Sequence, residues 1–256
     1  KPWYFPAMQT PSAGERHQPS KPYDLREASD AVRALMRDPG DVSQVFRIIN
    51  ALPGHAFERV VRRMKQSESG RKILRGQPEL MRRLADRDYL AALPDGSLGR
   101  EYLRFMDDEN LTAGALVNAD ETAGWDADQH SRELAHARQW LRDTHDLWHV
   151  VTGYHGDLLG EPALVAFQCV QNCWHPGFGF ISFMVFMRGG IFPGMRRIVL
   201  EGFWRAIRSG WLPGADWVAL LPQPLAEVRR QLQVAPLSPY KPLRVSDLPG
   251  GKLPPV

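Results

Sequence analysis

The chain has 256 residues, 43% of them hydrophobic, so it can bury a sizeable core as one large domain or two small ones. Its formal charge of +3 comes without an arginine tract, a zinc-finger spacing or an RNA-recognition motif, which argues against nucleic acid as a partner. The longest apolar run, 178–187, is too short for a membrane-spanning helix, which needs ~20 residues.

Residues 1–23 are rich in proline and polar side chains, which favours an extended N-terminal arm. Beyond the arm, apolar residues recur at helical spacing and no run alternates as a strand does. We therefore expect an all-α, single-domain, multi-helix bundle over residues 24–239, followed by a Pro-rich tail at 240–256. Breaks are expected at Asp38-Pro39-Gly40, Pro53-Gly54 and Ser69-Gly70. The predicted helices are 25–36, 42–52, 56–65, 78–85, 98–106, 129–141, 163–173, 178–188, 195–209 and 225–234.

The run His145-Asp146-Leu147-Trp148-His149 is the most informative feature of the chain. It follows residues 129–141, which lack Gly and Pro, so we expect it near the end of that helix. Each helical residue advances by ~100°, which places His145, Asp146 and His149 in one sector of the helix surface with the two imidazoles one turn apart. One metal ion can then contact all three side chains.

A further oxygen ligand is expected from the next helix. Glycines at 153, 156 and 160 break the chain, and Glu161 then opens the helix predicted at 163–173, so its carboxylate can turn back toward the same ion. Imidazole nitrogen and carboxylate oxygen suit one divalent ion, zinc in the first place, with cobalt, manganese or ferrous iron as alternatives. Asp146 can be a ligand, or can act as a base or orient a ligand.

The two cysteines, Cys169 and Cys173, lie one helical turn apart, so we expect core thiols in a reducing compartment rather than a disulfide. A second metal site formed with His175 is the alternative, although no fourth ligand is evident.

Two clusters of basic residues raise the possibility of an anionic membrane surface as a partner. The alternative is an ordinary solvated charged face. The first cluster is Arg59, Arg62, Arg63 and Lys65, and the second is Arg196, Arg197, Arg205 and Arg208, which flank Phe203, Trp204 and Trp211.

Phenylalanine and methionine are frequent in the segment after the motif, and both fill irregular apolar shapes. We expect these side chains to line a dry route for a long lipid tail, with an ordinary helix core as the alternative. The predicted lipid-binding residues are Phe167, Phe178, Phe180, Phe183, Met184 and Met187.

The motif, with Gly153 four residues after it and then Leu159-Gly160-Glu161, resembles the coenzyme Q biosynthesis protein 4 family, including the spacing of both glycines. Further similarity lies at 70–78, 93–102 and 228–232, so the resemblance runs from about residue 24 to residue 239.

The resemblance implies an all-helical protein that holds a divalent metal and acts on polyprenylated ring intermediates of ubiquinone, replacing the carboxyl group at ring carbon 1 with hydroxyl. It makes His145, Asp146, His149 and Glu161 the metal-binding residues, with Asp146 and His149 expected to be catalytic. It also implies a homodimer and other quinone-biosynthesis enzymes as partners. The expected location is cytoplasmic, peripheral on the inner face of the cell membrane, or the matrix side of the mitochondrial inner membrane in a eukaryote.

Two other functions compete with this prediction. One is a noncatalytic lipid-binding scaffold that organises quinone-biosynthesis enzymes. The other is a phosphohydrolase of the His-Asp type, which needs a further upstream His and a downstream Asp. His130, His136 and Asp216 are available, but their spacing does not fit, and that scheme leaves Glu161 unexplained.

Overall fold

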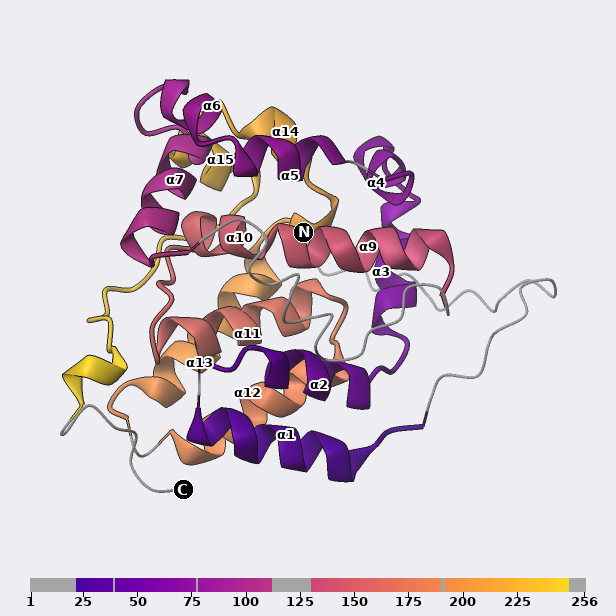
Figure 1. The fold of residues 1–256 in the computed structure, drawn as a ribbon, viewed down its shortest axis with the longest axis vertical. Helices are drawn as coiled ribbons and strands as arrows, with labels where there is room; N and C mark the ends of the chain where they lie inside the picture. Colours follow the sequence, from indigo (N-terminus) through magenta and orange to yellow (C-terminus); the bar gives the residue numbers. More distant parts are fainter. Residues whose placement is uncertain (1–21, 39, 77, 112–129, 190–191, 249–256) are drawn as a thin grey trace.

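The computed structural model describes residues 22–38, 40–76, 78–111, 130–189 and 192–248 (Figure 1). These residues form helices and no named strand, which confirms the all-α prediction. The predicted arm, apart from residues 22 and 23, lies outside the described residues, as do residues 249–256 of the predicted tail. No helix in the described ranges has both the length and the apolar character needed to cross a bilayer.

The helices that precede the motif are α1 (Leu25–Arg37), α2 (Ser43–Ala51), α3 (Ala56–Met64), α4 (Glu68–Leu74), α5 (Pro78–Ala85), α6 (Arg87–Ala92) and α7 (Leu98–Asp108). From residue 130 onward they are α9 (Arg132–Asp143), α10 (His145–Thr152), α11 (Gly160–Gln171), α12 (Pro176–Arg188), α13 (Met195–Arg208), α14 (Trp217–Leu220) and α15 (Leu225–Gln231). Two 3-10 turns, η2 (Leu212–Gly214) and η3 (Val245–Asp247), complete the described chain.

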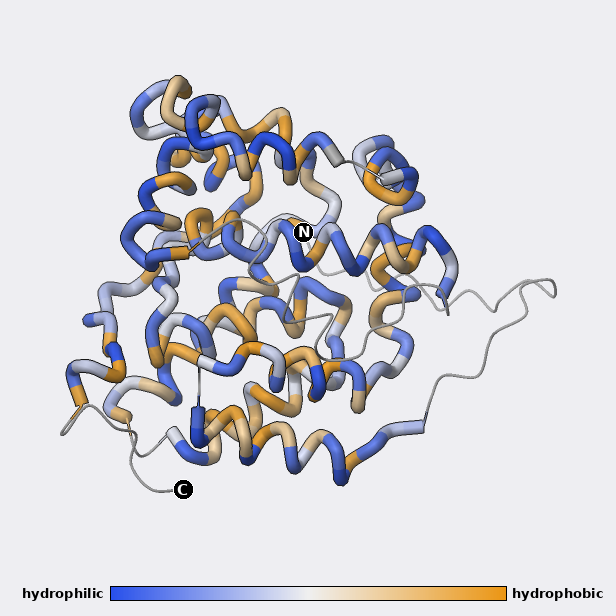
Figure 2. The backbone as a smooth tube through the Cα atoms, in the orientation of Figure 1, coloured by the Kyte–Doolittle hydropathy of each residue, from blue (hydrophilic) through white to orange (hydrophobic). Residues whose placement is uncertain are grey.

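Helix α11 lies in the middle of the molecule, between α10 on one side and α12 and α13 on the other (Figure 1). Most of its residues are buried around the whole circumference, as expected of a central helix. It packs very closely on α13, because a Cβ at Gly202 would lie only 2.3 Å from the carbonyl oxygen of Ala163. The largest hydrophobic core surrounds α10, α11 and α13, and a smaller one joins α1, α2 and α12. Figure 2 shows hydrophobic residues recurring along these helices.

The motif begins a helix of its own rather than ending the preceding one, which corrects the prediction. Helix α9 ends at Asp143, and Thr144 separates it from α10, which begins at His145. The buried Thr144 hydroxyl donates to the carbonyl oxygen of Trp140. A threonine that bonds the preceding turn in this way bends a helix, so the break needs neither Gly nor Pro.

The predicted break at Ser69-Gly70 is also wrong, since both residues lie within α4. The helix begins after Ser67, whose hydroxyl accepts the backbone N–H of Gly70. A Cβ at residue 70 would lie 2.1 Å from the carbonyl oxygen of Met64. Gly70 therefore serves a close approach between α3 and α4 rather than a turn.

Candidate metal centre and cavity

Helix α10 presents His145 and His149 one turn apart, with their Nε2 atoms 3.1 Å from each other. His149 is 1% exposed, and its Nδ1 lies 2.9 Å from the carbonyl oxygen of Tyr154. Gly153 ends the helix with a positive φ of 80°, which turns the chain so that this carbonyl can approach the ring. A proton on Nδ1 donates to Tyr154 and leaves the lone pair of Nε2 facing His145.

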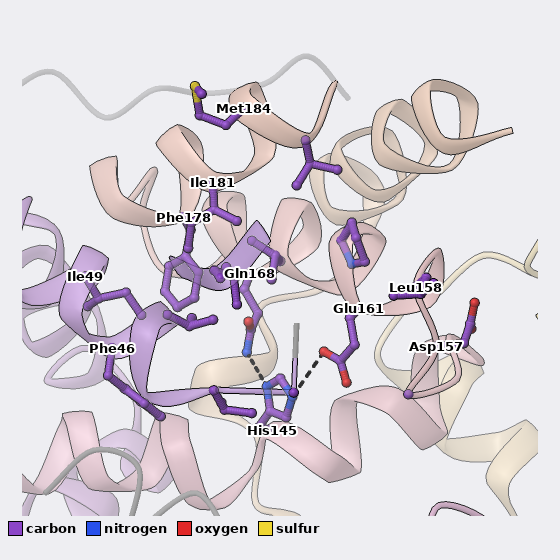
Figure 3. A pocket seen from close by; sticks show the side chains of 18 of the residues that line it. Phe46, Ile49, His145, Asp157, Leu158, Glu161, Gln168, Phe178, Ile181 and Met184 are labelled. Carbon is purple, nitrogen blue, oxygen red and sulfur yellow. Dashed lines mark hydrogen bonds and ion pairs between the residues drawn. The ribbon is translucent and has the colours of Figure 1, made fainter. Parts of the chain in front are cut away.

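Glu161 lies in the first turn of α11, and its carboxylate points toward the ring of His145 (Figure 3). One carboxylate oxygen is 3.2 Å from Nε2 of His149, and the other is 3.9 Å from Nε2 of His145. The preceding residue must be glycine, because a Cβ at Gly160 would lie 2.1 Å from the carbonyl oxygen of His155. Two successive helices, α10 and α11, thus bring three side chains that can bind a metal close together.

Buried Asp157 holds the connection between the two helices in place. Its carboxylate accepts hydrogen bonds from the backbone N–H of Leu159, the hydroxyl of Tyr240 and the backbone N–H of Leu243. The C-terminal segment is thereby tied to the turn that positions Glu161.

The charges of His145, His149 and Glu161 influence one another's pKa values. Burial disfavours protonation of His149, but the carboxylate of Glu161 outweighs burial and raises the pKa of His149 to about 8. Burial and the charge of His149 lower the pKa of His145. Burial acts to raise the pKa of Glu161, yet His149 outweighs it and lowers that pKa. The carboxylate therefore attracts a positive charge to this point, and a divalent cation can take the place of the proton.

The donor set fits a divalent metal ion. One ligand atom from each of His145, His149 and Glu161 lies within 4.8 Å of the others. Among the described residues, no other group of three or more His, Cys, Asp or Glu side chains has its ligand atoms this close together. Asp146 lines the adjacent cavity and is half-buried, but it is not part of that group. Gln168, which sequence reasoning missed, places its amide nitrogen 2.9 Å from Nδ1 of His145.

A cavity of about 760 Å³ is lined by two of these three residues, His145 and Glu161, and extends along α12 (Figure 3). His145, Asp146 and Glu161 contribute to one part of its wall. Much of the apolar wall is formed by side chains of α1, α2, α11 and α12, namely Val32, Leu35, Met36, Val45, Phe46, Ile49, Val165, Phe178, Ile181, Met184 and Val185. A largely apolar cavity whose wall also carries polar and charged groups is typical of a small-molecule site.

Of the six predicted lipid-binding residues, Phe178 and Met184 line the cavity. Phe167 is fully buried in the main core, where it packs edge-on against Trp148. Phe180 is half-buried and packs on the smaller core instead. Phe183 and Met187 are each 57% exposed on the opposite side of α12. The cavity lining therefore differs from the prediction at four positions.

The alternative sites suggested by the sequence do not form a ligand group in the described residues. The thiol of Cys169 is buried beside the carbonyl oxygen of His175, and burial raises its pKa to about 12. His136 bonds the carbonyl oxygen of Leu74, and Asp216 caps α14, so neither joins the motif as a phosphohydrolase requires.

The chain matches the model of a family described as Coenzyme Q (ubiquinone) biosynthesis protein Coq4 over residues 26–238. The mitochondrial ubiquinone biosynthesis protein coq-4 of Caenorhabditis elegans is 26% identical over 240 residues, covering 87% of this chain and 95% of the worm protein. The human COQ4 homolog is 32% identical over 159 residues, 61% of this chain and 57% of the human protein. The zebrafish homolog is 35% identical over 110 residues, 43% of this chain and 38% of that protein.

A solved structure shares the fold. It is the crystal structure of a protein from Nostoc punctiforme PCC 73102 described as a ubiquinone biosynthesis protein, which is 22% identical, with a TM-score of 0.56 over 83% of this chain and 99% of that one. Because the family model spans most of the chain, including the helices that carry His145, His149 and Glu161, the chain belongs to the Coq4 family of ubiquinone biosynthesis.

Proposed function

We propose that the protein is a metal-dependent oxidative decarboxylase, or C1-hydroxylase, of a polyprenylated 4-hydroxybenzoate-type ring. The observation that carries the proposal is that His145, His149 and Glu161 lie close together and that His145 and Glu161 line a largely apolar cavity. Membership of a ubiquinone-biosynthesis family supports a prenylated aromatic substrate. The cavity offers a polar point for the ring and an apolar wall for its chain.

The proposed reaction replaces the carboxyl group at ring carbon 1 with hydroxyl. The bond between the ring and the carboxyl carbon breaks and carbon dioxide leaves. One atom of dioxygen forms the new C–O bond, and the other becomes water with two electrons and two protons from a separate two-electron donor. A divalent ion held by His145, His149 and Glu161 supplies Lewis-acid polarisation of the phenol or carboxylate oxygen when it is bound.

Asp146 lines the cavity next to His145, which supports assigning to it the role of accepting the phenol proton of the substrate. Removing that proton makes the ring electron-rich at the carbon that bears the carboxyl group, which eases loss of carbon dioxide. Phe178 and Met184 keep water away from the ring and its chain. In this assignment Asp146 moves a proton, whereas the two histidines and Glu161 hold the ion.

Turnover by purified protein tests the proposal. Wild-type protein loaded with zinc, manganese, cobalt or ferrous iron is incubated with a prenylated 4-hydroxybenzoate, dioxygen and a two-electron donor, and carbon dioxide and the hydroxylated ring are measured. We expect both products in equal amounts. Binding of substrate without product under every metal would instead favour the noncatalytic scaffold that organises other quinone-biosynthesis enzymes.

The outer surface of α12 and α13 fits an anionic lipid bilayer, which we propose as a peripheral docking partner. Its exposed positions carry large apolar side chains bordered by arginines, and the one acidic residue of α13, Glu201, is half-buried and bonds the backbone of Ser238. A second copy docking symmetrically would set these arginines against themselves. The outer-surface residues are Trp174, Phe183, Met187, Leu200 and Trp204, with Arg196, Arg197 and Arg208 beside them.

Arg205, which the sequence grouped with these arginines, does not belong to the surface. It is buried and donates to the carbonyl oxygens of Thr152 and Ala235. Helix α12 itself has the cavity on one side, through Met184, and the exposed Phe183 on the other, so a prenylated substrate in the bilayer lies one helix away from the site.

Co-sedimentation with vesicles tests the docking surface. Wild-type protein should bind vesicles that contain phosphatidylserine better than vesicles of phosphatidylcholine alone, because each arginine near an anionic surface contributes about 1 kcal/mol. The double variant Phe183→Ser, Trp204→Ala should lose most of this binding. Leu25→Ser, which changes another exposed apolar residue, is the control. Equal binding by all three proteins would refute the docking surface. Light scattering of the purified proteins without vesicles tests the expected homodimer.

For localisation we propose the inner face of a bacterial cell membrane, or the matrix side of the mitochondrial inner membrane in a eukaryote. The curated relatives carry mitochondrial names, which supports the second option for eukaryotic proteins.

A further inference from the structure

Two histidines can bind one ion through Nε2 only if each carries its proton on Nδ1. The carbonyl oxygen of Tyr154 meets this need for His149, at 2.9 Å. For His145 the corresponding partner is the side-chain amide of Gln168, also at 2.9 Å. A neighbour that accepts the Nδ1 proton fixes the orientation of a ligand ring and raises its basicity.

We propose that Gln168 is a positioning residue of the centre, which orients His145 through its amide oxygen and offers its amide N–H to an anionic oxygen ligand of the ion. The inference rests on the proposed metal-dependent function and assigns a role to a residue outside the His-Asp-x-x-His and Glu161 motif. Gln168 lies two turns after Glu161 on α11, so a single helix supplies both a ligand and the group that orients another ligand.

The amide of Gln168 can face His145 in two ways. With Nε2 toward the ring, as in this structure, the amide donates to Nδ1, and the ring proton then resides on its own Nε2. Rotation of the amide by 180° brings Oε1 to that place, where it accepts the proton of Nδ1. The lone pair of Nε2 is thereby made available at the point shared with His149 and Glu161.

The same rotation turns the amide NH₂ of Gln168 away from His145. Gln168 is almost fully buried yet lines the cavity. Its Nε2 bonds His145, whereas its Oε1 has no hydrogen-bond partner among the described residues. The rotated NH₂ can therefore donate to an oxygen that enters from the cavity. Figure 3 shows the amide between His145 and the apolar side chains around Phe178.

Charge identifies the class of that ligand. A divalent ion with two neutral imidazoles and the carboxylate of Glu161 has a net charge of +1. The neutral amide of Gln168 leaves this charge unchanged, and Asp146 becomes neutral when it accepts the phenol proton as proposed above. The centre then favours one anionic oxygen, a phenolate or a carboxylate. A glutamate in place of Gln168 would bring the net charge to zero and remove the preference.

Cobalt(II) is a suitable probe, because its visible absorption reports both occupancy and coordination. Gln168→Met keeps the length of the side chain without an acceptor, and we expect cobalt affinity to fall by about 10- to 100-fold. Gln168→Glu keeps an acceptor, so cobalt affinity should be retained, while binding of 4-hydroxybenzoate to the cobalt protein should weaken by about tenfold or more. Circular dichroism verifies that each variant is folded.

Gln171→Met is the matched control, because Gln171 is a buried glutamine of the same helix that bonds the backbone carbonyls of Ala206 and Gly210. It should lower Tm without changing cobalt affinity. Wild-type cobalt affinity and spectrum in folded Gln168→Met would overturn the inference while leaving the metal centre intact. Absence of cobalt binding by the wild-type protein would instead overturn the metal centre and the inference together.

Discussion

Within the described ranges, two regions contain a buried histidine, and they differ in their charged neighbours. At the candidate centre, Glu161 contacts both rings of α10, and the pKa of His149 is raised to about 8 despite burial. His175, at the start of α12, is packed between the rings of Phe57 and Phe178. Burial, with the positive charges of Arg138 and Arg59, lowers the pKa of His175 to about 3.

The difference shows that burial and proximity of ligand-type atoms are not enough to make a cation site. His175 has Cys169 nearby, yet its Nδ1 accepts the backbone N–H of Gly177 and caps α12. Burial and the nearby arginines disfavour protonation of His175. Protonation of His149 is favoured instead, because a carboxylate oxygen of Glu161 lies 3.2 Å from its Nε2. The carboxylate of Glu161 is thus the feature that separates a candidate metal centre from a structural histidine.

The largest expected effect comes from removing a ligand. His149→Ala should reduce metal affinity by more than about 100-fold. Loss of a residue that only hydrogen-bonds a ligand costs up to about 100-fold, and loss of the ligand itself should cost more. Turnover should fall with metal content, as measured by elemental analysis and product assay on the same sample. Full activity of a metal-free His149→Ala protein would contradict the assignment.

The next effect separates proton transfer from metal binding. Asp146→Asn should reduce turnover by about 100-fold, the usual contribution of a positioned general base, while metal affinity changes by less than about tenfold. Asp146 lines the cavity but lies outside the three-residue group, which motivates this split. If the ion is lost together with activity, Asp146 is a ligand instead.

A pH effect is expected at His175. Its folded pKa of about 3 lies below the ordinary histidine value of 6.5, so the unfolded chain takes up a proton first as pH falls. The contribution to stability is fully present above pH 6.5, and about 2 kcal/mol of it is lost between pH 7 and pH 5. His175→Asn keeps a capping side chain without the titration.

Denaturant unfolding of both proteins at the two pH values measures this effect. The difference in unfolding free energy between wild type and His175→Asn should change by about 2 kcal/mol. A difference that does not depend on pH would show that His175 accepts a proton in the folded protein.

The smallest effect is expected at the cysteines. The double variant Cys169→Ala, Cys173→Ala should bind metal with the same stoichiometry as wild type and lose about 1 kcal/mol of stability, as is usual for a modest core substitution. Elemental analysis checks the first statement and thermal unfolding the second. A lower metal content would reinstate the second metal site.

Most helices were predictable because their apolar periodicity and capping residues are local properties of the sequence. The structure gives α5 at Pro78–Ala85, as predicted, and α1 with an end one residue later than predicted. The break at Thr144 was not predictable, because it arises from a hydroxyl that bonds the preceding turn in a segment free of Gly and Pro. The role of Gly70 was equally hidden, since it depends on how closely two helices pack.

Parts of the site could be derived from spacing and other parts could not. The two imidazoles and Glu161 were accessible, because helical geometry and a glycine turn bring them together. Gln168 was not, since a single glutamine has no spacing signal until α11 is seen to cross His145. Helix α12 is apolar on every face, so its sequence cannot tell the cavity side of Met184 from the exposed side of Phe183.

Equilibrium binding of zinc to metal-free wild-type protein and to Glu161→Gln tests whether Glu161 completes a metal centre. We expect one zinc ion per wild-type chain and an affinity lower by at least about 100-fold in the variant, because the amide keeps the shape of the side chain and removes its charge. Equal zinc binding by the two proteins, or no binding by the wild type, would contradict it.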